Sequence, residues 1–352
     1  MGTKGQQTLA EITTQPEAWA DALQAFEALQ GELKENWSSL RPQRVLFIGC
    51  GSTHYLSQTA AFLFQGLTGV PARACPSSEI VLFGPQVMPD PGRTLLVATS
   101  RSGTTTETLM AVDRFRRLGG QAVWTITCYP DSPLAQAADL VLPAEVAQEQ
   151  SVAQTRSFTS MLLLAQLLTA ALAGNVAMLE RLHRLPETLN DLVGRLGDLP
   201  RQLGMDLDIE RIYFLGGGPL YGVASEAMLK TKEMSLTHAE AYHPLEFRHG
   251  PMSMVNEHTL VVGLLSDAGL AEELRVLEEM QRLGARILVL AEDGSALTPW
   301  RPETVVELQS SLKEWERGLL YLPVLQRLAY HRALAKGLDP DRPNNLTAVV
   351  TL

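Results

Sequence analysis

One stretch of this sequence crowds hydroxyl groups around a single glycine. It reads VATSRSGTTTET, from Val97 to Thr108, and begins at the end of an apolar run of strand length. If that run is a strand and the following segment a helix, Ser100, Ser102 and Thr105 lie in the loop at the positive end of the helix. Hydroxyls and free backbone N–H groups at such a point suit a phosphate group, and Arg101 adds positive charge. The pattern predicts an anion-binding loop.

The alternative for this stretch is an ordinary helix cap and turn rich in Ser and Thr, residue types that are common in both. Seven Ser or Thr residues between Thr99 and Thr108 exceed what capping requires, which favours the anion. The stretch contains no GK[ST] sequence, so a Walker A loop and nucleotide hydrolysis are not favoured.

A second stretch, from Glu226 to Pro251, concentrates acid, base and cation. It reads EAMLKTKEMSLTHAEAYHPLEFRHGP, and we expect a helix that breaks into a loop rich in His and aromatic residues. A carboxylate such as Glu233 is a suitable base for moving a proton next to a carbonyl group, and His249 is a suitable proton shuttle for opening a sugar ring. The alternatives are a solvated helix residue for Glu233 and a loop-packing residue for His249.

The elements that position both stretches occur twice along the chain. RVLFIGCG at Arg44 returns as RIYFLGGG at Arg211, 167 residues later, and RTLLVAT returns as HTLVVGL with a separation near 165. RRLGGQAVWTIT likewise matches QRLGARILVLAE. Three landmarks at a nearly constant separation predict a duplicated domain.

Each copy alternates apolar runs of strand length with amphipathic helices. Continuous apolar runs are typical of parallel strands that are buried on both faces, so the predicted fold class is α/β, two domains in tandem, each a parallel sheet with helices on both faces. An amphipathic helix containing Leu23, Phe26 and Leu33 precedes the first copy. Helices around MLLLAQLLTAALAG and PETLNDLVGRL join the copies, and a helix from Glu314 to Lys336 precedes the tail.

Composition narrows the class of protein. The chain has 352 residues, of which 45% are hydrophobic and 19% charged, as in a globular protein of about two domains. Its net charge of −10 argues against nucleic acid as the main partner.

Three cysteines without a CxxC pair indicate a reducing cytoplasm and no cysteine-bound metal. The N-terminus lacks the apolar core of a signal peptide, and the longest apolar run is too short to span a bilayer, so we expect a cytoplasmic protein with no membrane partner.

Two cofactor classes are considered and not favoured. The glycines at Gly49–Gly51 and Gly216–Gly222 form no GxGxxG followed by an acidic residue about 20 positions later, as a dinucleotide site requires. A zinc site from His238, His243 and His249 would lack both HExxH and a cysteine partner. We therefore expect neither a cofactor nor a metal.

Taken together, several motifs resemble one known family. They are FIGCGST, SRSGTTTET, SVAQTRSFTSMLLL, MLKTKEMS, HAEAYHPLEFRHGP and GLDPDRPNNLT. The chain resembles the tandem sugar isomerase (SIS) domain proteins, of the type that forms the isomerase half of glutamine–fructose-6-phosphate aminotransferase. SRSG in place of SQSG, and the chain length, are more similar to stand-alone amino-sugar-phosphate deaminases and isomerases. Position 2 is not a cysteine, so we expect no glutaminase half and do not expect glutamine as the nitrogen source.

The resemblance implies roles for individual residues. Copy one would hold the substrate, and copy two would carry the enolisation base Glu233, the neighbouring Lys230 and the ring-opening His249. In the family this histidine comes from the neighbouring subunit, which implies a homodimer with a shared site. The residues implied to hold the sugar phosphate or contact the substrate are Ser100, Arg101, Ser102, Thr105, Thr53 and Gln154.

One position departs from the family pattern. The family's terminal NLxK, whose lysine forms a Schiff base with the ketose, reads NLTA here and ends in Ala348. Because an alanine methyl group cannot attack a carbonyl, we expect a reaction without a Schiff base at that position, with Lys336 as the lysine that could replace it.

These observations predict four segments and one reaction class. The segments are an N-terminal helical part (1–40), a first SIS domain that binds phosphosugar (41–185), a second with the catalytic base (186–336) and a tail (337–352). The expected activity is isomerisation or deamination of an amino-sugar or ketose phosphate, such as glucosamine 6-phosphate or fructose 6-phosphate, through an enediol. The alternatives are a non-catalytic or degenerate sugar-phosphate-binding protein and a fructosamine-phosphate deglycase.

Overall fold

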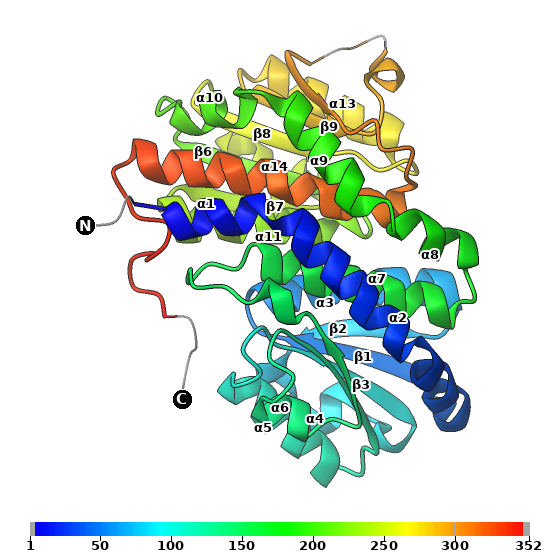
Figure 1. The fold of residues 1–352 in the computed structure, drawn as a ribbon. Coiled ribbons are helices and arrows are strands. Elements are labelled where there is room, and N and C mark those ends of the chain that lie inside the picture. The colour runs from blue at the N-terminus through cyan, green and yellow to red at the C-terminus, as the bar shows by residue number, and fades with distance from the viewer. Residues whose placement is uncertain (1–3, 299, 301, 348–352) are drawn as a thin grey trace. The chain divides into compact units, whose positions relative to one another are not determined.

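The structure is a computed structural model that describes residues 4–298, 300 and 302–347. The chain divides into two compact units, each built around one sheet (Figure 1). The first unit contains Thr13–Glu149 and Gln154–Pro186, and the second contains residues 4–12, Gln150–Ala153 and Glu187–Leu346. The segment boundaries expected from the sequence, at residues 40, 185 and 336, stay a prediction.

The first unit holds a parallel sheet with the spatial order β2-β1-β3-β4-β5. From β1 the chain first crosses to β2 on one side and then returns to β3 on the other, so the direction of strand order reverses between β1 and β3. The register places Ile48 of β1 opposite Ala98 of β3. Its strands are β1 (Arg44–Gly49), β2 (Ala72–Pro76), β3 (Thr94–Thr99), β4 (Ala122–Thr127) and β5 (Leu140–Pro143).

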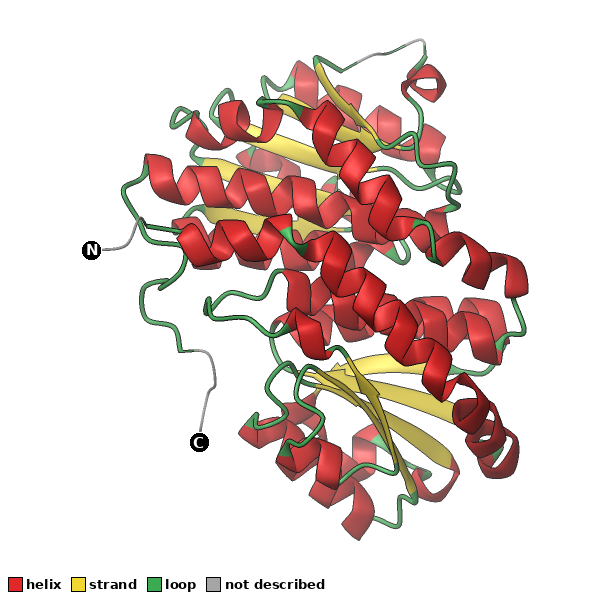
Figure 2. Cartoon of the chain, viewed as in Figure 1, coloured by secondary structure: helices red, strands yellow, loops and turns green. Residues whose placement is uncertain are grey.

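Helices cover both faces of this sheet (Figure 2). On one face, Phe115 packs with Leu96 and Val123; on the other, the ring of Phe64 lies 5.7 Å from that of Phe47. All six residues of β3 are buried as a result. The helices are α2 (Gln15–Leu40), α3 (Ser52–Thr68), α4 (Ser77–Val87), α5 (Thr106–Arg117), α6 (Pro133–Gln136), α7 (Arg156–Leu172) and α8 (Val176–Leu182), with short 3₁₀ turns η1 (Pro91–Arg93) and η2 (Glu145–Ala147).

The second unit repeats this topology, with the parallel order β7-β6-β8-β9-β10. Its strands are β6 (Arg211–Gly216), β7 (His238–Tyr242), β8 (Thr259–Leu264), β9 (Arg286–Ala291) and β10 (Thr304–Glu307). Its helices are α1 (Gln6–Thr13), α9 (Leu185–Leu196), α10 (Leu199–Met205), α11 (Leu220–Ser235), α12 (Pro244–Phe247), α13 (Leu270–Arg282) and α14 (Glu314–Ala335), with 3₁₀ turns η3 (Pro251–Met254) and η4 (Gly294–Leu297).

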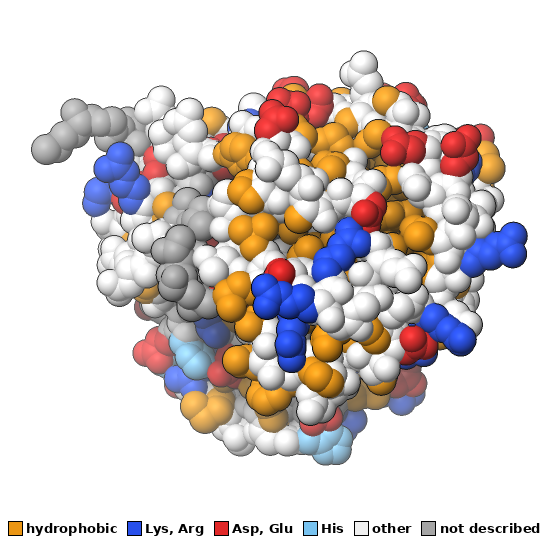
Figure 3. Space-filling model, turned by 90° about the horizontal axis from the view of Figure 1, so that it is seen from below, with side chains coloured by type: hydrophobic (Ala, Val, Ile, Leu, Met, Phe, Trp, Pro, Cys, Tyr) orange, Lys and Arg blue, Asp and Glu red, His pale blue; other side chains and the backbone are white. Residues whose placement is uncertain are grey.

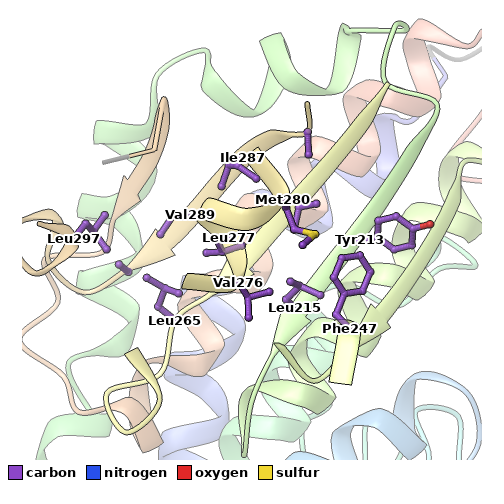
Figure 4. Close-up of a cluster of buried hydrophobic side chains, with 13 residues drawn as sticks. Tyr213, Leu215, Phe247, Leu265, Val276, Leu277, Met280, Ile287, Val289 and Leu297 are labelled. Carbon is purple, nitrogen blue, oxygen red and sulfur yellow. The ribbon is translucent and has the colours of Figure 1, made fainter. Parts of the chain in front are cut away.

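Figure 4 shows the hydrophobic cluster on one face of the second sheet. Val276, Leu277 and Met280 of α13 point toward side chains of β6 and β9, and Phe247 of α12 lies against Tyr213. The Phe247 and Tyr213 ring centroids are 4.9 Å apart. This cluster anchors the segment that carries His249, because Phe247 is fully buried two residues before it.

The sequence-based fold prediction is confirmed: two α/β repeats, each with a parallel sheet between layers of helices. The apolar runs correspond to β1, β3, β4, β6, β8 and β9, and the predicted long helices to α2, α7, α9 and α14. The loop expected after Glu233 is wrong in part, because this segment contains the edge strand β7 and the short helix α12. β7 is only five residues long and mostly half-buried, so it has no continuous apolar run.

On the face shown in Figure 3, hydrophobic, basic and acidic side chains are interspersed, with no broad field of one charge sign. Across the described part of the chain, no helix combines the length and apolar character that crossing a bilayer would require.

Candidate active site

The hydroxyl-rich loop lies at the point where the strand order of the first sheet reverses. It leaves β3, while the loop that leads into α3 leaves the neighbouring strand β1. In open parallel sheets, ligands bind at this position, because two adjacent loops diverge there and open a crevice. The sequence-predicted residues of the first repeat lie on the loop after β3 or, for Thr53, in the first turn of α3, apart from Gln154.

Within the loop the hydroxyls hold one another in place. Ser100 Oγ accepts a hydrogen bond from the Gly103 N–H (3.1 Å) and lies 3.0 Å from Thr105 Oγ1. Ser102 Oγ accepts from both the N–H (3.2 Å) and the hydroxyl (2.9 Å) of Thr104. Because a hydroxyl oxygen accepts two bonds and donates one, these contacts occupy the Ser102 lone pairs and leave its O–H as a donor.

Gly103 is required at its position by two independent constraints. Its φ of +63° lies in the left-handed region, which side chains with a Cβ disfavour. A Cβ built there would also lie 1.9 Å from Ser132 Oγ. The turn therefore stays compact just before α5, whose first-turn N–H groups have no partner within the helix.

Arg101 is held by an ion pair inside the first unit. Its guanidinium lies 3.3 Å from the carboxylate of Glu149, and the side chains are 8% and 0% exposed. Glu149 also accepts hydrogen bonds from the backbone N–H (2.6 Å) and hydroxyl (2.7 Å) of Thr155 and from the hydroxyl of Ser157. Arg101 is thus compensated by a carboxylate, and the pair joins the loop after β3 to the start of α7.

Thr53 and Gln154 are placed differently from each other. The Thr53 hydroxyl donates to the carbonyl of Cys50 (3.0 Å) and accepts from its N–H (2.9 Å), so it shapes the turn between β1 and α3. The side-chain oxygen of Gln154 is buried and accepts no hydrogen bond from any residue that the structure describes.

Two further buried oxygens, close in sequence to the hydroxyl loop, have no hydrogen-bond partner among the described residues. They are Thr99 Oγ1 and Glu107 Oε2. Buried polar groups are almost always hydrogen-bonded, so these acceptors can take a donor from ordered water or from a ligand. A bare phosphate is an acceptor and cannot satisfy Glu107, whereas the hydroxyl or ammonium groups of a sugar can.

In the second unit, three charged side chains of α11 form a buried cluster. The ammonium group of Lys230, 1% exposed, lies 3.4 Å from the carboxylate of Glu226 and pairs with that of Glu233. Glu226 is fully buried, while the Glu233 side chain is 19% exposed. The cluster therefore fixes Glu233 by one oxygen and leaves part of its carboxylate accessible, as a general base requires.

The three histidines weighed as zinc ligands lie in different settings. His249 is exposed in the turn after α12, where it lines a hollow of about 580 Å³ with Leu245, Arg248, Met252 and Glu279. The His243 ring stacks on Tyr221 at a centroid distance of 4.0 Å, and burial lowers its pKa despite the opposing effect of Glu246. His238 lies in β7, 3.6 Å from Glu240.

Among the described residues, no group of three or more His, Cys, Asp or Glu side chains has a metal-binding arrangement.

In the second unit, the loop after β8 corresponds to the hydroxyl loop, and its donors bind a side chain of the same unit. After β8, the N–H and hydroxyl of Ser266 both donate to the carboxylate of Glu273, each at 2.8 Å. Burial raises the pKa of this carboxyl group, while the Ser266 hydrogen bonds act in the opposite direction. A carboxylate of α13 thus occupies the two donors of Ser266 in the loop before this helix.

Sequence reasoning missed Glu149 and Glu226. Glu226 had a usable signal, because it precedes Lys230 by four residues and Glu233 by seven, so all three lie on one face of a helix. Glu149 had none, since its partners Arg101 and Ser157 lie far from it along the chain or across a loop.

Two predictions concern the tail. Lys336 donates to the carbonyl of Leu236 (3.1 Å), and burial lowers its pKa, with a further contribution from Arg332. This contact places Lys336 at the C-terminal end of α11. Ala348, at the position of the family lysine, lies outside the described residues, so the Schiff-base prediction stays a prediction.

Comparison with known proteins identifies the repeat. The SIS domain family matches residues 40–171 and 207–314, which together are more than half of the chain. The chain spans about half the length of the curated relatives that it matches. The glutamine–fructose-6-phosphate aminotransferase (isomerizing) of Pseudomonas syringae pv. tomato is 31% identical over 320 residues, which cover 88% of this chain and 52% of that protein.

Two solved structures match nearly all of the chain. The glucosamine-6-phosphate deaminase of Thermotoga maritima is 30% identical with a TM-score of 0.78, and the match covers 98% of this chain and 100% of that one. The tagatose-6-phosphate ketose/aldose isomerase of Escherichia coli is 26% identical with a TM-score of 0.87, covering 97% and 96%.

The charged cluster generates a stability prediction. Lys230→Met should lower the free energy of unfolding by about 3–5 kcal/mol, because the buried carboxylate of Glu226 then loses the ammonium group with which it pairs. Urea denaturation measures the change. Lys232→Met, an exposed lysine on the same helix, is the matched control and should stay within about 0.5 kcal/mol of the parent protein. Equal stability of both variants would contradict the cluster.

Proposed function

From the premise that this chain belongs to the SIS domain family, we propose that it isomerises a phosphosugar and releases ammonia when the substrate carries an amino group at C2. The observation that carries the proposal is the accessible carboxylate of Glu233, held by a buried lysine, in a chain whose first unit presents an open hydroxyl loop. The substrate class is an amino-sugar or ketose phosphate of six carbons, such as glucosamine 6-phosphate or fructose 6-phosphate.

The hydroxyl loop is the proposed phosphate site. Ser102 retains an O–H donor, one of the Ser100 and Thr105 hydroxyls retains another, and the N-terminus of α5 adds backbone N–H groups and its dipole. Arg101 contributes through its backbone and its fixed side chain rather than as an uncompensated charge, since Glu149 neutralises it. The acceptors Glu107 and Gln154 suit the hydroxyl and amino groups of the attached sugar.

Glu233 is the proposed base. In the open-chain amino sugar it removes the C2 proton while the carbonyl oxygen at C1 gains a proton, which gives an enolamine. It then returns the proton to C1 while the nitrogen loses one, which leaves a hydroxyl group at C1 and an imine at C2. Water then adds to the imine carbon and ammonia leaves, giving the ketose phosphate. Lys230 keeps Glu233 in place, and His249 is proposed to move the proton that opens the ring, acting from the neighbouring subunit of a homodimer. No bond between enzyme and sugar is needed, which suits a chain with Ala348 in its tail.

The full-length match to a glucosamine-6-phosphate deaminase supports release of ammonia rather than transfer from glutamine. The deglycase alternative differs only in the amine that leaves, and a non-catalytic binding protein would keep the phosphate site without turnover.

The phosphate loop is tested by Ser102→Ala combined with Thr105→Ala. Loss of two hydroxyl donors to a charged group should weaken binding of fructose 6-phosphate at least about tenfold. Isothermal calorimetry measures the affinity. Ser38→Ala with Ser39→Ala, two exposed serines of the same unit, is the control. Equal affinities in the two double variants would remove this loop from phosphate binding.

The reaction is tested by incubating the protein with glucosamine 6-phosphate, fructose 6-phosphate and a fructosamine phosphate, following ammonia, free amine and isomer formation. We expect turnover of at least one, and a fall in kcat of about 10²- to 10⁴-fold for Glu233→Gln. Glu272→Gln, an exposed glutamate of the same unit, should keep full activity. Binding without any turnover would leave the non-catalytic alternative.

The shared site is tested by mixing two inactive variants. Subunits carrying Glu233→Gln and subunits carrying His249→Ala should each be inactive alone and should regain about a quarter of the activity or more in hybrid dimers, because one hybrid site combines both intact residues. Differently tagged subunits allow the heterodimer to be purified before assay. An inactive heterodimer would place both residues in one chain's site.

A further inference from the structure

The N-terminal helix α1 is capped by a residue from the other end of the chain. The carboxylate of Asp341 accepts hydrogen bonds from the backbone N–H groups of Gln7 (3.2 Å) and Thr8 (2.7 Å), and from the Thr8 hydroxyl (2.7 Å). Thr8 is fully buried. First-turn N–H groups have no partner inside a helix, and a carboxylate is the favoured cap. Asp341, in the tail, thus caps the first turn of α1, a role that a residue directly before the helix usually has.

The residues before α1 bind the same part of the tail. The Lys4 ammonium donates to the carbonyl of Gly337 (2.6 Å), and the Gly5 N–H donates to the carboxylate of Asp339 (3.0 Å). Gly5 has φ +73°, and a Cβ there would lie 2.8 Å from Pro340. Figure 1 shows the start of the chain, in blue, beside the tail, in red. Tail residues 337–341 are therefore held by the first turn of the chain.

The other end of α1 binds a second segment. The buried carboxylate of Glu11 accepts from the N–H groups of Gln150 (2.6 Å) and Ser151 (3.2 Å) and from the Ser151 hydroxyl. The Val152 N–H donates to the backbone carbonyl of Asp341 (3.3 Å). All of these groups belong to the second unit, and α1 brings the tail and residues 150–152 together.

The second of these segments leads directly to the proposed site. Gln154, whose buried side-chain oxygen accepts no hydrogen bond from a described residue, follows Val152 by two residues. Because consecutive Cα atoms are at most 3.8 Å apart, a shift of Val152 is transmitted to Gln154 with little slack.

We propose that α1 and Asp341 form a bracket that positions the Gln154 loop for the sugar, with Glu11 and Asp341 as positioning residues. This inference rests on the proposed function, and it assigns the N-terminal helix a role in substrate binding that its sequence does not show. The bracket acts on the sugar more than on the phosphate, since the hydroxyl loop receives none of these hydrogen bonds among the described residues, and Glu149, which pairs with Arg101 of that loop, is held separately by Thr155 and Ser157.

The test uses Glu11→Gln and Asp341→Asn in the full chain, with Glu17→Gln, an exposed glutamate six residues after Glu11, as the matched control. Each bracket variant should raise KM for the phosphosugar about tenfold with a smaller change in kcat, because a displaced binding group weakens orientation of the substrate. The affinity for inorganic phosphate should stay at the parent value. Hydrogen exchange of the Gln150 and Ser151 amides should become faster in Glu11→Gln.

The outcomes separate this inference from the proposed function. If the parent protein turns over no sugar, the proposed reaction fails, and affinity for fructose 6-phosphate relative to inorganic phosphate replaces KM as the readout. If Asp341→Asn does not fold, Thr8→Val removes a single bond to the same carboxylate and should raise KM about threefold. Variants that match Glu17→Gln in sugar affinity, or that lose phosphate and sugar affinity equally, would overturn the bracket.

Discussion

A parallel sheet buried on both faces leaves a ligand only one kind of place to bind. Helices cover β3 so completely that none of its six residues is exposed, and the same holds for β4 and β8. The loops at the carboxyl ends of the strands are then the exposed parts nearest the core, and those beside the reversal of strand order diverge most. The hydroxyl loop, the Thr53 turn and the Glu273 carboxylate all lie at such ends. The positions of the proposed binding residues therefore follow from the way the core is closed.

Sequence reasoning recovered the parts that depend on local pattern. Central strands such as β1 and β3 are uninterrupted apolar runs, and a run of six such residues has few other structures open to it. The edge strands β2, β7 and β10 were not identified, because an edge strand is short and partly exposed, so its apolar and polar residues mix. Ser100, Ser102 and Gly103 were found because they lie within one short stretch of the sequence. Glu149 and Asp341 were not, because each acts on residues far from it in the chain, and a single sequence carries no record of that proximity.

Buried carboxylates organise much of this structure. Glu149, Glu226, Glu11 and Glu273 are each nearly or fully buried, and each accepts hydrogen bonds or an ion pair. The partners of Glu149 and Glu11 include residues distant in sequence, whereas those of Glu226 and Glu273 lie on the same helix or in the loop before it. A buried charge is tolerated only when its oxygens are paired, so each of these residues fixes several partners at once. The net charge of −10 thus says little about the molecule's surface alone, since part of the acidic complement lies inside and holds loops in place.

The carboxylate of Glu273 bears on how the two repeats can respond to ligand concentration. Duplication of a binding domain ordinarily creates two equivalent sites, and two sites in one chain can cooperate. Here the second copy satisfies its own loop donors with a side chain, which leaves one open hydroxyl loop in the described part of each chain. If the hydroxyl loop is the phosphate site proposed above, a sigmoidal dependence on phosphosugar would have to arise from coupling between subunits, because the described residues of one chain offer no second open loop of this kind to couple to.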